Sequence, residues 1–225
     1  MPVVLVTGSN RGIGLEFVRQ YAAEGWRVHA ACRNPDRARE LAAVSGDVTV
    51  HRLDVTDDAA VGALATALEG EGLDVLINNA GLLESSSFGR TDGEAWLRSF
   101  RVNCIAPIHL LERFTPHLER GKLKRAVAIT SKMGSIADNT SGGSYIYRSS
   151  KAALNAAMRS AAIDLRPKGI IVAVLHPGWV KTDMGGPGAL MAAATSVSGM
   201  RARIAALSPA DSGRFFNFDG QELPW

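Results

Sequence analysis

The fold of this chain is decided near its start, in the stretch VVLVTGSNRGIG at residues 3–14. The apolar run Val3–Thr7 predicts a buried strand, and the segment after the last glycine is long enough for a helix. The loop between them contains Gly8, Gly12 and Gly14, which let the backbone turn sharply. Glycines are common in turns of every kind. Strand, loop and helix in this order, however, predict a site where a pyrophosphate rests on the first amides of the helix.

Short apolar runs alternate with helix-length segments along the rest of the chain. The expected strands are Val3–Thr7, Arg27–Cys32, Val48–Leu53, Asp74–Asn78, Ala126–Ser131, Ile170–His176 and a short one near Arg214–Phe218. The expected helices are Gly14–Glu24, Asp36–Val44, Asp58–Leu68, Asp92–Glu119 and Tyr145–Leu165. This alternation predicts a doubly wound α/β fold, a Rossmann-type parallel sheet of about seven strands with helices on both faces. The length fits a single domain over residues 1–225.

The composition narrows the classes of function. The 25 Lys and Arg residues against 22 Asp and Glu residues give a net charge of +3, and because the charges are interspersed we expect no nucleic-acid partner. The apolar runs are shorter than the roughly 18 residues of a membrane span, and no basic leader segment precedes the first strand. The histidines lack metal-ligand spacing, so no metal site is expected. Cys32 and Cys104 stand far apart, which is typical of a reduced, cytoplasmic protein.

Tyr147 and Lys151 form the pair in the sequence that points to chemistry. Their spacing places both side chains on one face of a helix, about one turn apart. An ammonium held roughly 4 Å from a phenol favours the phenolate by about 4 kcal/mol at an effective dielectric constant near 20, or about three pKa units before screening. We therefore expect Lys151 to lower the pKa of Tyr147 toward neutrality, which suits proton transfer. The same spacing also occurs often by chance, so it needs support from the rest of the chain.

With the glycine loop and this pair together, the sequence resembles a short-chain dehydrogenase/reductase over essentially the whole chain. Further landmarks of that family follow in order, most of them at the predicted strand ends: Asp54-Val55, Asn78-Asn79-Ala80-Gly81, Asn103, Ser131, Pro177-Gly178 and Thr182. Within the family, three stretches look like the C-factor and sniffer-type carbonyl reductase branch: Tyr147–Asn155, Leu175–Gly186 and Gly220–Trp225.

The resemblance implies a catalytic tetrad of Asn103, Ser131, Tyr147 and Lys151. In the family, the serine binds the substrate carbonyl, the tyrosine donates the proton, and the lysine also holds the nicotinamide ribose. Pro107 has no amide hydrogen to offer the carbonyl of Asn103, so the helix should kink there. By resemblance, this carbonyl holds a water that links the lysine to solvent. The alternative is that Asn103 is a buried amide satisfied by neighbouring backbone.

The expected cofactor is NADP(H) and not NAD(H). Rossmann-type sites that prefer NAD have an acid at the end of the second strand, whereas here Cys32 leads into Arg33, and Arg11 lies in the glycine loop. Two guanidinium groups suit a 2′-phosphate, although Arg33 also fits an exposed loop residue. By resemblance, the cofactor-binding residues are Gly8, Ser9, Arg11, Gly12, Ile13, Gly14, Arg33, Asp54, Val55, Asn79, Ala80, Gly81, Tyr147, Lys151, Pro177, Gly178, Val180 and Thr182.

Residues 183–207 are expected to form a substrate lid, with the glycines at 185–188 as its hinge. Its apolar side chains favour a modest apolar aldehyde or ketone as the small-molecule substrate, although methionines also fill ordinary cores: Met184, Leu190, Met191 and Met200. The polar loop 134–144 is expected to border the substrate mouth. Tyr145 competes with Tyr147 as proton donor but lies off the face of Lys151. An alanine-rich face of the same helix permits close helix packing, which in relatives occurs against a second subunit, so the resemblance implies a homodimer or homotetramer.

Two functions follow from these observations. The first is an NADPH-dependent carbonyl reductase, which the presence of the whole tetrad favours. The second is a C-factor-like cell-signalling protein that binds NAD(P) with catalysis secondary, because C-factor is associated with intercellular developmental signalling in bacteria. Turnover of a carbonyl compound distinguishes the two.

Overall fold

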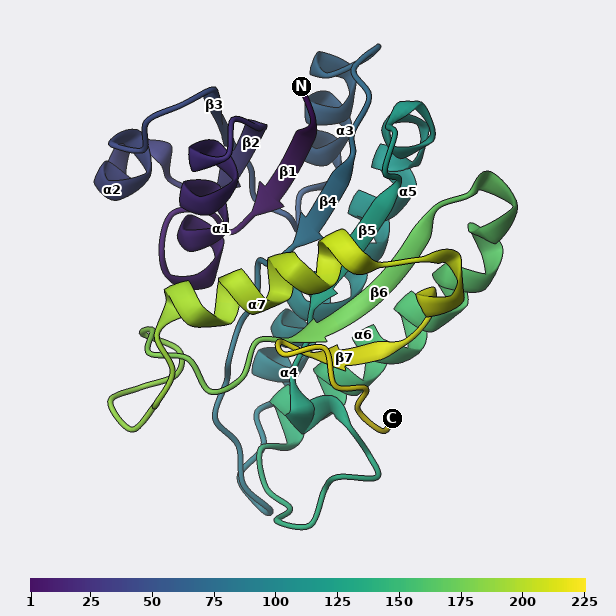
Figure 1. The fold of residues 1–225 in the computed structure, drawn as a ribbon. Coiled ribbons are helices and arrows are strands. Elements are labelled where there is room, and N and C mark those ends of the chain that lie inside the picture. Colours follow the sequence, from purple (N-terminus) through teal and green to yellow (C-terminus); the bar gives the residue numbers. More distant parts are fainter.

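A single parallel sheet organises the computed structural model, which describes all residues 1–225. Its seven strands lie in the order β3-β2-β1-β4-β5-β6-β7 (Figure 1). The strands are β1 (Val3–Thr7), β2 (Arg27–Cys32), β3 (Val48–Arg52), β4 (Val75–Asn78), β5 (Arg125–Ile129), β6 (Ile171–His176) and β7 (Phe215–Asn217). The order reverses between β1 and β4, which creates the crevice in which open α/β sheets bind ligands. The predicted doubly wound fold is confirmed.

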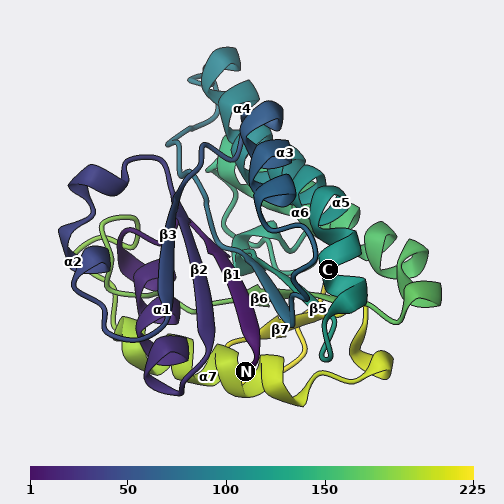
Figure 2. The same ribbon diagram turned by 90° about the horizontal axis from the view of Figure 1, so that it is seen from above.

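Helices cover both faces of the sheet (Figure 2). One face carries α1 (Gly12–Ala23), α2 (Arg39–Ala42) and α7 (Ala193–Ala206), and the other carries α3 (Asp58–Ala67), α4 (Gly93–Phe100), α5 (Ala106–Arg120) and α6 (Tyr145–Asp164). A separate apolar core lies on each side, with Phe17 fully buried on the face of α1 and Phe114 fully buried on the face of α5. None of these helices has the length and apolar character needed to cross a membrane.

Three elements differ from the sequence prediction. The expected helix 36–44 is a short turn at Pro35–Arg37 followed by the four-residue α2. Strand β3 lies at the edge of the sheet, and its residues are exposed or half-buried instead of forming a continuous apolar run. The segment after residue 192 forms helix α7, whose Val197, Met200 and Ile204 are buried in the core. Helix α7 packs on the sheet and is the last helix of the doubly wound fold.

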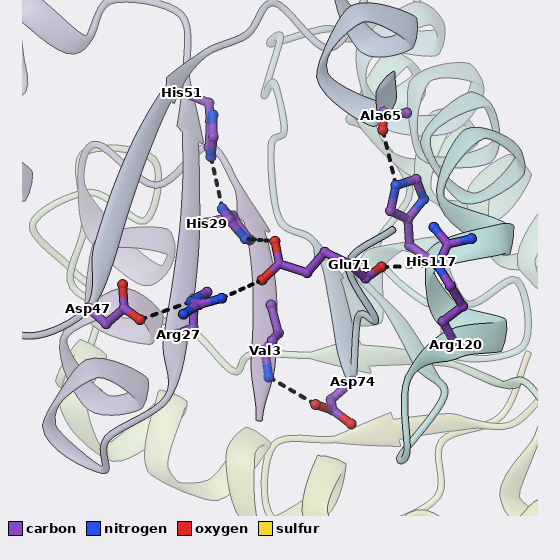
Figure 3. A network of polar contacts seen from close by, with 10 residues as sticks. All are labelled: Val3, Arg27, His29, Asp47, His51, Ala65, Glu71, Asp74, His117 and Arg120. Carbon is purple, nitrogen blue, oxygen red and sulfur yellow. Dashed lines mark hydrogen bonds and ion pairs between the residues drawn. The ribbon is translucent and has the colours of Figure 1, made fainter. Parts of the chain in front are cut away.

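A polar network ties the α3–β4 connection to β2 and β3 (Figure 3). The Glu71 carboxylate accepts a hydrogen bond from Arg27 at 3.0 Å and lies 2.9 Å from Nε2 of His29. The other ring nitrogen of His29 lies 2.9 Å from Nε2 of His51. Burial and the neighbouring His29 lower the pKa of His51, which favours a neutral ring there. The network satisfies the polar groups on this part of the sheet, and none of its residues lines the cleft described below.

Candidate active site

One cleft of about 720 Å³ lies at the carboxyl edge of the sheet. It is bordered by the residues that follow successive strands, and the long loops 79–92 and 135–144 extend on the same side, below α4 in Figure 1. Fifteen of the predicted cofactor residues line it: Gly8, Arg11, Gly12, Ile13, Gly14, Arg33, Asp54, Val55, Asn79, Ala80, Gly81, Tyr147, Lys151, Pro177 and Thr182. Parallel strands bring their carboxyl ends to one edge, which is why residues so far apart in the sequence meet here.

The glycine loop forms the first wall of the cleft. Gly8 has a φ of +65°, and a Cβ on Gly14 would lie 2.2 Å from the carbonyl oxygen of Gly8. The side-chain amide of Asn79 donates to the carbonyl oxygens of Thr7 and Gly8, at 2.9 and 3.2 Å. These contacts require glycine at both positions and leave the first amides of α1 open toward the cleft.

Ser9, Gly178 and Val180 do not line the cleft, although the sequence placed them there. The Ser9 hydroxyl is fully buried and donates to the carbonyl oxygen of Ala31 at 3.0 Å, so it joins the glycine loop to β2. Gly178 faces Met191, whose methyl carbon is 3.0 Å from where a Cβ would stand. The backbone of Val180 pairs with Met191 as well. These three residues therefore support the segments that line the cleft and do not line it themselves.

Two arginines line the cleft, and one of them, Arg33, directly follows β2. Arg33 is exposed there, and Arg11 pairs with Asp183 at 2.7 Å across the mouth. Burial would raise the pKa of Asp54, but hydrogen bonds from Thr56 and the charge of Arg33 lower it, so Asp54 is ionised. The prediction that this end lacks an acid directly after β2 agrees with the structure, because Cys32, Arg33 and Asn34 line the cleft there.

Asn103 lies in a π-helical turn, Arg101–Ile105, between α4 and α5. The missing amide hydrogen of Pro107 accounts for this local departure from α-helix. The Asn103 side chain is fully buried, with its oxygen accepting from the amide of Leu82 at 2.8 Å and its nitrogen donating to Ser150 at 3.0 Å. The predicted break in the helix is therefore present, and the side chain fixes the loop after β4.

Tyr147 and Lys151 line the cleft, and Ser131 lies beside Tyr147 without lining the cleft itself. Burial raises the pKa of Tyr147 to about 12, and the neighbouring Ser131 side chain lowers it only in part. Burial also lowers the pKa of Lys151 to about 8. The Lys151 ammonium lies 5.9 Å from the centroid of the Tyr147 ring and donates to the carbonyl oxygen of Ile129 at 2.9 Å. The prediction that Lys151 brings the phenol toward neutrality was wrong for the chain alone, because desolvation outweighs an ammonium at this distance.

The segment expected to be a lid divides into two parts. Met184 lines the cleft and Leu190 is 82% exposed, whereas Met200 is fully buried in the core beneath α7. Trp179 donates to the carbonyl oxygen of Gly185 at 2.8 Å and packs on the glycine-rich turn. Tyr145 lies against Phe88, with ring centroids 6.2 Å apart, and does not line the cleft. Only the stretch before α7 therefore lies beside the cleft.

Several lining residues were missed by the sequence reasoning. They are Asn10, Cys32, Asn34, Glu40, Leu53, Leu82, Val102, Ile129, Thr130 and Lys181. Most of them stand directly beside a predicted residue or at a strand end, which was the available signal. Glu40 and Val102 lie on helices, and their place in the cleft depends on how those helices pack.

The chain belongs to the short chain dehydrogenase family, whose model matches residues 2–190. Among its relatives, C-signal of Myxococcus xanthus is 48% identical over 164 residues, which cover 72% of this chain and 99% of C-signal. Two solved structures cover the whole of this chain and are themselves covered completely. The NADPH-bound carbonyl reductase from chicken fatty liver has a TM-score of 0.93 at 36% identity, and the carbonyl reductase Sniffer of D. melanogaster has a TM-score of 0.93 at 34% identity. These similarities agree with the predicted C-factor and sniffer-type branch.

Proposed function

We propose that this chain is an NADP(H)-dependent oxidoreductase that reduces an aldehyde or ketone to an alcohol, with Tyr147 as general acid. The observation that carries the proposal is that Tyr147 and Lys151 line the cleft one helical turn apart, with Ser131 beside Tyr147. The likeness over full length to the NADPH-bound carbonyl reductase from chicken fatty liver supports the same reaction class.

The residues of the cleft fit a dinucleotide. The close approach of Gly14 to Gly8 leaves room for a pyrophosphate at the start of α1, where the helix dipole favours negative charge. At the β2 end, Arg33 and Arg11 suit the 2′-phosphate that distinguishes NADP(H) from NAD(H). Asp54 and Val55 would flank the adenine, and Thr182 would meet the nicotinamide amide.

The tetrad residues divide the work of the reaction. When bound, the dihydronicotinamide supplies the hydride for the carbonyl carbon. Ser131 and Tyr147 hydrogen-bond the carbonyl oxygen, where negative charge develops, and Tyr147 gives its proton to that oxygen. A phenol with a pKa of about 12 stays protonated at neutral pH, which suits the reductive direction. Lys151 would hold the nicotinamide ribose, and the carbonyl of Asn103 would hold a water that passes protons from solvent toward Lys151.

The substrate preference follows from apolar side chains beside the cleft. Met184 and Leu190 stand on the exposed segment before α7 and favour a modest apolar substrate.

Half-buried and exposed small residues on α6, Ala153 and Ala156 among them, suit close packing against a second copy as a homodimer or homotetramer. We place the enzyme in the cytoplasm, where the free thiols of Cys32 and Cys104 stay reduced.

Oxidation of NADPH by the purified chain, with a panel of aldehydes, ketones and diketones, tests the proposal. We expect turnover that prefers NADPH to NADH and that falls by at least about 10³-fold in Tyr147→Phe, since the phenol supplies the transferred proton. Tyr145→Phe is the matched control and keeps the activity. Tight NADPH binding without turnover of any compound would contradict the reductase proposal.

The second candidate is a signalling protein that binds the cofactor and does not depend on turnover. The 48% identity to C-signal of Myxococcus xanthus favours it. Retention of signalling activity by Tyr147→Phe, with NADPH binding intact, supports this candidate and separates it from the reductase.

A further inference from the structure

Helix α6 contacts the end of β5 through a row of evenly spaced side chains. Tyr147, Lys151 and Asn155 follow one another at four-residue intervals, so they lie on one face of the helix. Tyr147 meets Ser131, and Lys151 donates to the carbonyl oxygen of Ile129. Asn155, the third member of the row, has no part in the reaction proposed above.

Asn155 holds the two sides of the Ser131 turn. Its side-chain oxygen accepts a hydrogen bond of 2.7 Å from the Thr130 hydroxyl, directly before Ser131. Its nitrogen donates at 3.4 Å to the carbonyl oxygen of Gly134, three residues after Ser131. Asn155 is 3% exposed and Thr130 is 2% exposed, so water does not compete for these bonds.

The turn itself leaves little freedom at its inner side. A Cβ on Gly134 would lie 2.9 Å from Cβ of Lys151, so the turn rests directly on the backbone of α6. Ser131 begins the turn, and its hydroxyl accepts from the amide of Met133 at 3.1 Å. On the outer side, the carbonyl oxygen of Trp225 accepts hydrogen bonds from Ser135 and Ala137 at 3.0 and 2.9 Å. Asn155 thus joins both ends of the turn to the helix of Tyr147, and the Arg148 side chain of the same helix adds one bond to the middle of the turn, to the carbonyl oxygen of Met133 at 3.4 Å.

We propose that Asn155 is a positioning residue that fixes the Ser131 hydroxyl relative to the Tyr147 phenol. This inference rests on the proposed function, because the distance between the two hydroxyls matters only if both bind one carbonyl oxygen. A displacement of about 1 Å between such groups can lower a rate by about 10²-fold. Asn155 acts through Thr130 and Gly134 and does not touch the substrate.

Asn155→Leu tests the proposal, because leucine has a similar volume and makes neither hydrogen bond. We expect kcat to fall by about 10- to 100-fold, with the Kd for NADPH, measured by fluorescence, changed by less than about threefold. Thr130→Val should lower kcat in the same way, whereas Thr130→Ser, which keeps the hydroxyl, should have a kcat close to that of the wild type. The double variant Thr130→Val/Asn155→Leu should be no slower than the slower single variant, because both changes break one connection. Ser160→Ala, elsewhere on α6, is the control and keeps the wild-type kcat.

A second readout does not need turnover. Crystal structures of the wild type and of Asn155→Leu give the distance between Ser131 Oγ and Tyr147 Oη, which we expect to differ by about 1 Å. A folded Asn155→Leu protein with wild-type kcat, or with Ser131 in its wild-type place, overturns the inference. A wild-type chain without turnover overturns the proposed function instead, and the two crystal structures then still decide whether Asn155 positions Ser131.

Discussion

Lys151 donates a hydrogen bond of 2.9 Å from Nζ to the carbonyl oxygen of Ile129, at the last residue of β5. The lysine is 4% exposed, and its ammonium thus has a fixed backbone partner at the floor of the cleft. Burial lowers the pKa of Lys151 to about 8, although the hydrogen bond to Ile129 itself favours the charged form.

Lys151→Met should change how stability depends on pH. Because burial lowers the folded-state pKa of Lys151 from 10.5 to about 8, the folded chain binds the proton less tightly than the unfolded chain. The free energy of unfolding of the wild type should therefore rise by about 3 kcal/mol, relative to the variant, between pH 8 and pH 10.5. Urea unfolding of both proteins at these two pH values measures the difference, and equal slopes with pH would contradict the assigned burial effect.

His176→Gln should reduce the sensitivity of the chain to acid. Burial and the charge of Lys132 lower the pKa of His176 to about 4, against the opposing charges of Asp138 and Asp219. The ring stays neutral in the folded state, so the wild type should lose about 3 kcal/mol as pH falls from about 6.5 to about 4. The variant should lose less over that range in urea unfolding, and an unchanged pH profile would refute the prediction.

Arg33→Ala should weaken the binding of NADPH selectively. A charge-assisted hydrogen bond to the 2′-phosphate is worth about 1.5–3 kcal/mol, so the Kd for NADPH should rise about 10- to 100-fold. The Kd for NADH should stay unchanged, because NADH has no 2′-phosphate. Fluorescence titration with both cofactors decides this, and a parallel loss of both affinities would show that Arg33 acts on structure instead.

Ser9→Ala should affect stability more than cofactor binding. The Ser9 hydroxyl is fully buried and bonds to Ala31, so its removal leaves the carbonyl oxygen of Ala31 with one partner fewer. We expect the free energy of unfolding to fall by about 1 kcal/mol, with the Kd for NADPH changed by less than about twofold. A large loss of affinity in a variant of unchanged stability would return Ser9 to the cofactor site.

The sequence alone was sufficient for the strands along the chain, for most of the helices and for most of the cleft. Alternation of apolar runs with helical segments is a strong signal, and the ends of parallel strands converge wherever such a sheet forms. The glycine loop was equally readable, because Gly8 and Gly14 stand where a Cβ has no room. For the same reason the residues missed in the cleft were mostly neighbours of predicted ones.

Features that depend on packing could not be predicted. The pKa values of Tyr147 and Lys151 follow from how completely both are buried, which their spacing does not reveal. Met200 carries the same apolar signal as Met184, yet one lies in the core and the other in the cleft. Asn155 looked like an ordinary helical residue, because its partners come from a different element of the chain.

The two edge strands of the sheet, β7 and β3, differ in whether another strand can pair with them. The amide of Leu223 donates to the carbonyl oxygen of Phe215 at 2.8 Å, and Asn217 donates to Gln221 at 2.8 Å, so the ladder of β7 already has a companion from its own chain. The opposite margin, β3, has no such companion and carries the charged Arg52, paired with Asp36 at 2.5 Å. A strand from another molecule therefore cannot easily add to the sheet at β7, where the chain itself already occupies the edge. At β3, the charged side chains disfavour such an addition.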